Sequence, residues 1–278
     1  MVTVKRVTKF VLIAPDELHR ELLERYRDKI PREFSQYKEY KWGALTLPLE
    51  PDSPELKEAC LYVRSLGYHP RLFSEVYYTK KELERIAYFQ MEVGSPLELE
   101  GTTASDYGTK YDGACPVCGI GGKRTGNVLV DRKFLKKRKI GFLAPDLFVS
   151  EKTRQIIEDH GFTGVSFDGE VKDYKGREIE KYYTMSIHHV LPPMSKSTWL
   201  SDFSAKVGII PECNHHKIYL ESDIQYEHEK LHGALDFNLS SEYVNNDKEQ
   251  QLVVSARVRR VFKENKIGFT HFIPITII

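Results

Sequence analysis

Two short pairs of potential metal ligands constrain this chain more than any other feature of its sequence. Cys115 and Cys118 form the first pair, in the run Cys-Pro-Val-Cys-Gly, and Cys213 and His216 form the second, in the run Cys-Asn-His-His. In each pair two residues separate the ligands, so one tight turn can direct both side chains at the same ion. Four such ligands satisfy the tetrahedral coordination of zinc. The spacing therefore predicts one zinc site, formed by segments that are far apart in the sequence.

The same residues indicate what the zinc does. His215, adjacent to His216, is the alternative fourth ligand. Four protein ligands leave no open position for a substrate, which favours a structural zinc over a catalytic one. A redox CxxC would stand at the start of a helix after a buried strand, whereas Gly119, Gly121 and Gly122 follow the first pair and indicate a loop or ribbon. A reduced thiol pair without metal is the remaining alternative.

Composition is typical of a globular protein in a reducing compartment. The 278 residues are 41% hydrophobic and 12% aromatic and carry a formal net charge of +1, which suffices for one large or two smaller cores. No apolar run approaches the roughly 18 residues of a membrane span, and the first residues lack the apolar core of a signal peptide. Three of the four cysteines belong to the zinc set, and Cys60 is predicted to be a buried thiol on the apolar side of a helix. We therefore expect a cytoplasmic protein without membrane contact.

Residues 1–93 are predicted to form an α/β region. At the start of this region acidic residues precede basic ones, and Leu18, Leu22 and Tyr26 recur at helical spacing. A glycine at position 67 marks the end of a second helical pattern. The predicted elements are helices over residues 15–30, 54–66 and 80–89 and a strand over residues 71–79.

Residues 94–278 contain a faint internal repeat. The run Leu-Phe-Val-Ser at 147–150 matches Leu-Val-Val-Ser at 252–255, 105 positions later. Each run predicts a strand that ends in a serine N-cap, followed by a short helix and a second strand. A chance match is the alternative. The same offset pairs Arg154 with Arg259, Ile156 with Val261, Ile157 with Phe262, Asp159 with Glu264, and Phe167 with Phe272.

The repeat and the ligand pairs together predict the fold class. Each copy is preceded by one ligand pair, so two modules that share one zinc would explain the long separation between the pairs. We expect an α+β protein in which two similar strand-helix-strand modules, with copies at about 115–171 and 213–278, are joined at a zinc knuckle. The α/β region 1–93 precedes them.

The first knuckle, the second ligand pair and the recurring apolar-Val-Ser, helix and strand pattern resemble the bacterial double-CXXCG motif proteins. The resemblance covers about Cys115–Ile278. Cys115 and Cys118 match the first motif, whereas in the second motif His216 stands where a cysteine is expected and Lys217 replaces the glycine. Zinc accepts histidine for cysteine, so metal binding is compatible with this departure.

Some members of that family are regarded as immunity proteins, which protect a cell from a toxin of its own kind. The resemblance thus implies a zinc-binding, non-enzymatic cytoplasmic protein of the immunity or antitoxin type. Its partner would be another protein, such as a cognate toxin.

A basic run supports a second hypothesis, a zinc-dependent nucleic-acid-binding protein. Basic side chains beside a zinc knuckle can bind phosphates. The alternative is a solvated face whose charge is offset by acids elsewhere. The candidate residues are Arg132, Lys133, Lys136, Lys137, Arg138 and Lys139.

A third hypothesis is a metallohydrolase. His228-Glu-Lys-Leu-His232 has the H-E-x-x-H order, in which a helix presents two zinc ligands and a glutamate base, here Glu229. Gly233 follows at once and makes a long helix doubtful. The sequence contains no P-loop, no GxSxG elbow and no dinucleotide fingerprint.

Overall fold

A computed structural model gives the fold as a mixed α+β protein with few helices and many strands. Its contacts divide the chain into two compact units: Met1–Arg85 with Glu221–Asp223, and Ile86–Leu220 with Ile224–Ile278. No helix among the described residues is long and apolar enough to cross a membrane. The structure describes residues 5–30, 39–41, 44–50, 53–68, 70–94, 107–113, 122–135, 138–143, 145–198, 200–202, 218–220, 223–244, 249–268 and 270–278.

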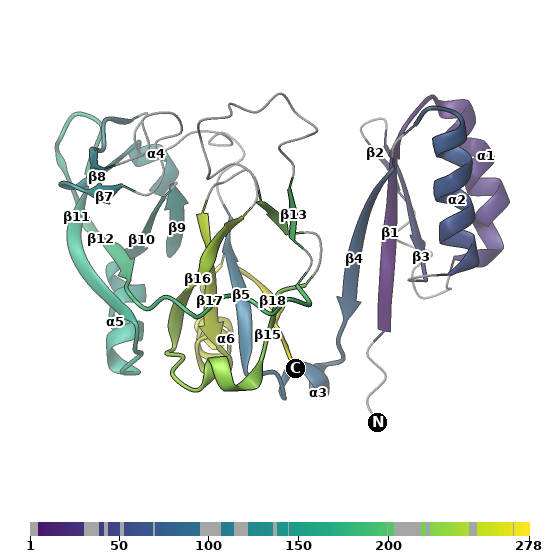
Figure 1. Ribbon diagram of the computed structural model, residues 1–278. Coiled ribbons are helices and arrows are strands. Elements are labelled where there is room, and N and C mark those ends of the chain that lie inside the picture. The colour runs from purple at the N-terminus through teal and green to yellow at the C-terminus, as the bar shows by residue number, and fades with distance from the viewer. Residues whose placement is uncertain are drawn as a thin grey trace. The chain divides into compact units, whose positions relative to one another are not determined.

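The first unit is a four-stranded antiparallel sheet with two helices on one face (Figure 1). The strand order is β2-β3-β1-β4, and β1 pairs antiparallel with both β3 and β4. This order of strands and helices is the ferredoxin-like, split βαβ arrangement. The elements are β1 (Lys5–Ile13), α1 (Asp16–Tyr26), η1 (Arg27–Lys29), β2 (Glu39–Lys41), β3 (Ala44–Leu49), α2 (Pro54–Ser65), β4 (Arg71–Tyr77) and α3 (Lys80–Leu83).

Local signals in the sequence explain the two long helices, and both predictions are confirmed. Ser53 accepts a hydrogen bond from the Leu56 amide (3.2 Å), so α2 begins with a side-chain cap. The helix ends before Gly67, whose φ of +83° favours glycine. Cys60 lies inside α2 and is 8% exposed, so it is a core thiol as predicted, and burial raises its pKa. The core of this unit also contains Phe10, Leu12, Leu22, Leu45, Leu47 and Val63.

The predicted helix over residues 80–89 is wrong in its second half. The helix α3 ends at Leu83, and β5 (Tyr88–Val93) follows. Phe89 and Met91 are buried, and β5 is hydrogen-bonded along both edges, by β17 (Glu249–Ser255) and β18 (Thr270–Pro274). Pairing with strands about 160 or more residues away therefore overrides the local helical pattern. As a result β5 belongs to the second unit, although it lies within the region 1–93.

The second unit contains two larger sheets and three short ladders. One sheet has the order β8-β11-β12-β10-β9, and the other has the order β16-β17-β5-β18. The remaining elements are β6 (Tyr111–Asp112), β7 (Lys123–Arg124), β8 (Val128–Val130), α4 (Arg132–Leu135), β9 (Ile140–Leu143), β10 (Asp146–Ser150), α5 (Glu151–Asp159), β11 (Val165–Asp173), β12 (Glu178–Ile187), β13 (Leu200–Asp202), β14 (Ile218–Leu220), β15 (Gln225–Tyr226), η6 (His228–Leu231), β16 (Phe237–Val244), α6 (Ala256–Glu264) and β19 (Thr276–Ile277).

The helix starts predicted at Ser150 and Ser255 are confirmed. Each serine Oγ accepts a hydrogen bond from the third amide of its helix, and both distances are 3.4 Å. Two residues after the end of each helix the chain has a positive φ, at Gly161 (57°) and Lys266 (51°). The strands predicted on either side of each helix are also present.

Candidate metal centre

The predicted zinc ligands lie outside the described residues. Cys115 and Cys118 fall in the segment 114–121, and Cys213, His215 and His216 fall in the segment 203–217. Among the residues that the structure does describe, no group of three or more His, Cys, Asp or Glu side chains could hold a metal ion. The described residues on either side of these segments form two short strand ladders.

A two-stranded antiparallel ladder borders the first segment. Tyr111 on β6 pairs with Arg124 on β7, and Asp112 pairs with Lys123. The ladder is attached to β10, because the Arg124 Nε donates to Asp146 Oδ1 (3.0 Å) and the Tyr111 hydroxyl donates to Asp146 Oδ2. The first ligand pair thus stands on a stretch of chain whose two ends are held together.

A second two-stranded antiparallel ladder borders the other segment. On its two strands, Leu200 pairs with Leu220 and Asp202 pairs with Ile218. The chain that leads into β13 is held by Gln225, which accepts at its carbonyl from the Ser195 amide (2.7 Å). Both ligand pairs are therefore carried between the strands of a closed ladder. Two thiolates, or a thiolate and an imidazole, are donors that fit zinc.

The His228-Glu-Lys-Leu-His232 segment differs from a zincin helix. Residues His228–Leu231 form a single 3₁₀ turn rather than an α-helix. The rings of His228 and His232 meet edge to face, with centroids 5.0 Å apart, and Glu229 is exposed. Within the part of the chain that the structure covers, no third ligand joins them.

The basic run is engaged with the protein at each of its four described basic positions, including Lys133, which forms an ion pair with Asp131 (3.3 Å). Arg132 forms an ion pair with the buried Asp173 (Nε to Oδ2, 3.3 Å), and Arg138 donates to the carbonyl of Gly94 (3.0 Å). The Lys139 ammonium donates to two carbonyls at the end of α6. Lys133 is exposed, and Lys136 and Lys137 lie outside the described residues.

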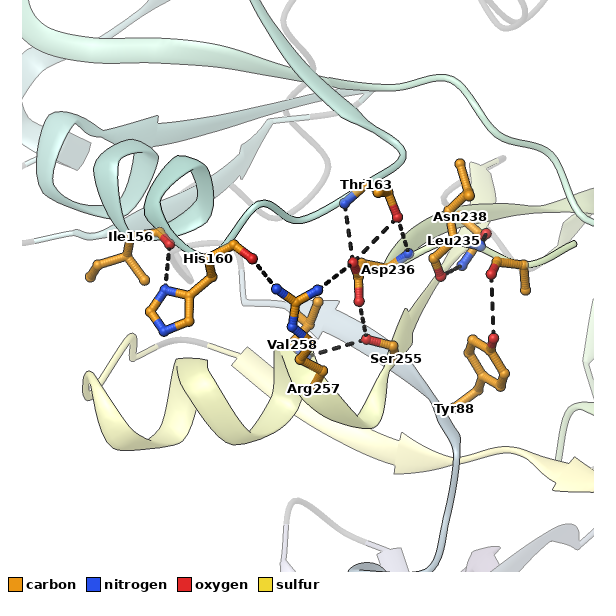
Figure 2. A network of polar contacts seen from close by, with 11 residues as sticks. Tyr88, Ile156, His160, Thr163, Leu235, Asp236, Asn238, Ser255, Arg257 and Val258 are labelled. Atoms are coloured by element: carbon orange, nitrogen blue, oxygen red, sulfur yellow. Dashed lines mark hydrogen bonds and ion pairs between the residues drawn. The ribbon is translucent and has the colours of Figure 1, made fainter.

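The structure contains a polar network that the sequence analysis did not identify (Figure 2). Asp236 Oδ2 accepts from the amide (3.1 Å) and the hydroxyl (3.3 Å) of Thr163, and Oδ1 accepts from the Ser255 hydroxyl (2.7 Å). Arg257 forms an ion pair with Asp236 (3.2 Å) and also donates to the carbonyl of His160 at the end of α5. We call these four side chains, Thr163, Asp236, Ser255 and Arg257, the Asp236 cluster.

The Asp236 cluster joins the two strand-helix-strand segments. It connects the end of α5 with the start of α6, and the Phe237 amide adds a hydrogen bond to the Thr163 carbonyl (3.0 Å). The cap at Ser255 was the only part of this network with a local signal in the sequence, since Thr163 and Asp236 are 73 positions apart. Its hydrogen bonds link the end of α5, the residue before β16 and the start of α6, which is the geometry of a structural contact between elements.

The hydroxyls of two tyrosines donate to backbone carbonyls that lie just before the first strand of a hairpin, β9 or β16. The Tyr182 hydroxyl donates to the carbonyls of Leu135 (2.6 Å) and Arg138 (2.9 Å), and the Tyr88 hydroxyl donates to the carbonyl of Ala234 (3.4 Å). Burial raises the pKa of both hydroxyls, so they act as donors at neutral pH.

No protein-family model matches this chain, and no curated protein matches it in sequence.

Proposed function

We propose that the chain is a non-enzymatic protein-binding protein of the immunity or antitoxin type, built around one structural zinc. Cys115, Cys118, Cys213 and His216 would hold the ion, with His215 as the alternative fourth ligand. The metal would join two similar strand-helix-strand modules, at about 115–171 and 213–278. Its compartment would be the cytoplasm.

One observation carries the metal assignment: each ligand pair stands between the strands of a closed antiparallel ladder, β6 with β7 and β13 with β14. A ladder keeps the two ends of its loop together, which lowers the entropy lost when two side chains converge on one ion. The strand that precedes the first pair, β6, is two residues long and partly exposed, unlike the buried strand expected before a redox CxxC.

The surroundings favour a protein partner over the two alternatives. Arg132, Arg138 and Lys139 already bind carboxylate or carbonyl groups of the protein, so fewer cations remain for phosphates. The 3₁₀ turn at His228 does not present its two histidines as a zincin helix would. A scaffold whose elements are fixed by a metal and by the Asp236 cluster offers a rigid surface, and rigid surfaces lose little entropy on binding.

Replacing Cys118 by serine tests the metal site. We expect zinc content, measured by elemental analysis, to fall from about one ion per chain to less than half. Because zinc ligation is coupled to folding, Tm should fall by about 10 °C or more. Cys60→Ala is the matched control, since that thiol is buried in α2 and should leave the zinc content unchanged. Full zinc occupancy and an unchanged Tm in Cys118→Ser would refute the site.

Co-expression tests the partner. The intact chain should rescue growth from a toxin encoded beside its gene and should co-purify with it. Rescue should persist in Glu229→Gln, which removes the base that a hydrolase would need. Metal-dependent turnover lost in Glu229→Gln would instead establish the enzyme. Salt-sensitive nucleic-acid binding, lost when Lys136, Lys137 and Arg138 become glutamate, would establish the nucleic-acid alternative.

A further inference from the structure

The two sheets of the second unit repeat one arrangement of strands. Four neighbouring strands in the first sheet are β9-β10-β12-β11, and the four in the second are β16-β17-β5-β18. Every neighbouring pair in both sets is antiparallel. In each set a helix, α5 or α6, connects the second strand to the fourth along the chain. The two central strands differ in their position along the chain. β12 follows the other strands of its set in the sequence, whereas β5 precedes the other strands of its set.

The register of the central strand agrees at corresponding positions of the two sets, up to a bulge between Ser166 and Gly169 that is present in β11 and not in β18. Ser150 lies opposite Tyr182, and Ser255 lies opposite Tyr88. On the other edge Val165 lies opposite Ile187, and Thr270 lies opposite Val93. One offset of 105 positions relates the helical segments, and one offset of 94 positions relates the central strands.

Side-chain contacts follow the same two offsets. The guanidinium of Arg154 lies 4.4 Å from the ring centroid of Tyr183, and that of Arg259 lies 4.7 Å from that of Phe89. The two tyrosines that precede these rings, Tyr88 and Tyr182, each donate to carbonyls shortly before the first strand of a set, β16 or β9, although these carbonyls are not related by the offset of 105. The strands have the related sequences Tyr-Phe-Gln-Met-Glu-Val and Tyr-Tyr-Thr-Met-Ser-Ile. Contacts of this kind depend on register, so a common offset is not expected from two unrelated sheets.

The edge strands extend the correspondence. Val128 on β8 pairs in parallel with Val171, and Gln225 on β15 pairs in parallel with Thr276, again 105 positions after Val171. A ladder that carries one ligand pair precedes each of these edge strands.

We propose that residues 88–173 and 182–278 are two copies of one repeat that have exchanged their first strands. The first strand of the first copy, β5, completes the sheet of the second copy. The first strand of the second copy, β12, completes the sheet of the first. The second unit is thus an intramolecular form of a strand-exchanged dimer.

Contacts at the helix ends reinforce the exchange in both directions. Lys139, from the first copy, donates to the carbonyls of Asn265 (2.8 Å) and Lys266 (2.9 Å) at the end of α6. Arg257, from the second copy, donates to the carbonyl of His160 at the end of α5. A cation at a helix C-terminus is favoured by the unpaired carbonyls there. Each copy therefore supplies the cation that the helix of the other copy binds.

The exchange has a consequence for stability. A central strand forms hydrogen bonds along both of its edges, so removing it leaves two unpaired edges in the other copy. Loosening either strand should therefore loosen the copy whose sheet holds it and, through the contacts of Lys139 with the end of α6 and of Arg257 with the end of α5, the other copy as well.

Exchanging the residues at three of the four positions where the two strands differ, in the full-length chain, tests their equivalence; Phe89 and Tyr183 are kept, because Phe89 is fully buried and Tyr183 is only half-buried. The variant carries Gln90→Thr, Glu92→Ser and Val93→Ile together with Thr184→Gln, Ser186→Glu and Ile187→Val. We expect cooperative unfolding with a Tm within about 8 °C of the parent, because each new side chain enters a position of similar burial. The matched control, Met91→Glu with Glu92→Met, keeps the composition but places a carboxylate at a position that is 3% exposed, and it should lose cooperative unfolding. An exchange variant as disrupted as this control would overturn the equivalence.

Hydrogen exchange of Met91→Ala in the full-length chain tests the mutual dependence. Met91 lies in β5, and its truncation should speed amide exchange at least about tenfold in α6 and by a similar factor in α5. Met185→Ala, in β12, is the reciprocal variant and should give the same pattern. Faster exchange confined to α6 in the first variant and to α5 in the second would overturn the proposal that the copies depend on one another.

Discussion

Gly164 lies in the turn between α5 and β11, where the chain passes beside β16. Its φ is +84°, and an added Cβ would lie 2.1 Å from the carbonyl oxygen of Phe237. The neighbouring Thr163 forms hydrogen bonds to Asp236 and Phe237 on the same side. Both the backbone conformation and the lack of space therefore require glycine at this position.

Gly164→Ala should lower the free energy of unfolding by about 3 kcal/mol. A left-handed conformation costs a non-glycine residue about 1–2 kcal/mol, and moving the turn away from Phe237 sacrifices hydrogen bonds worth about 1 kcal/mol each. Gly176→Ala is the control, because Gly176 has a φ of +77° with nothing within 4 Å of an added Cβ. Gly176→Ala should lower the free energy of unfolding only by the cost of the left-handed conformation, about 1–2 kcal/mol. Urea unfolding of both variants gives the comparison, and equal losses would show that the contact with Phe237 is unimportant.

At the scale of elements, α5 and α6 begin with the same cap but differ in what the serine touches. Ser150 contacts Thr153 within its own helix (Oγ to Oγ1, 3.1 Å). Ser255 also donates to Asp236, which lies in another element. Replacing Ser150 therefore measures the contribution of a cap alone, and replacing Ser255 measures that of a cap together with a tertiary contact.

Ser150→Ala should cost about 1 kcal/mol, the usual value for a lost N-cap. Ser255→Ala should cost about 2 kcal/mol, because Asp236 Oδ1 also loses its donor. In an Asp236→Ala background the loss from Ser255→Ala should return to about 1 kcal/mol. Denaturant unfolding of the parent chain, Ser255→Ala, Asp236→Ala and the double variant measures the coupling between Ser255 and Asp236. Additive losses of unfolding free energy would contradict this coupling.

The sequence predicted those elements whose signals are local. The caps at Ser150 and Ser255 and the glycine at position 67 set helix ends through neighbouring residues, and these predictions are confirmed. The strand β5 could not be predicted in this way, since its partners lie about 160 or more residues away. The ligand pairs were found from spacing alone, and their convergence on one ion stays a prediction.

At the scale of the whole molecule, the position of β5 moves the division between the units. The sequence placed a boundary after residue 93, whereas the compact units divide at Arg85. Eight residues separate these two positions, and they contain nearly all of the central strand of one sheet.

Two truncations distinguish the boundaries. A chain of residues 86–278 should fold and unfold cooperatively, because it keeps β5 between β17 and β18. A chain of residues 94–278 should aggregate or lack a cooperative transition, because it exposes two unpaired strand edges. Circular dichroism melts and size-exclusion chromatography provide the readout. Equal melts for the two chains would mean that β5 is dispensable.

The antiparallel pairing of β5 with β18 also sets how the molecule responds to mechanical force. The start of β5 and the end of β18 lie at the same end of the pair, where the Ile275 amide donates to the Tyr88 carbonyl (3.1 Å). Tension applied through residues 87 and 275 would therefore load one hydrogen bond at a time, as in opening a zipper, rather than all of them in shear. Because a single hydrogen bond contributes only about 1 kcal/mol, a motor that draws the chain from either terminus would meet little resistance at this pair.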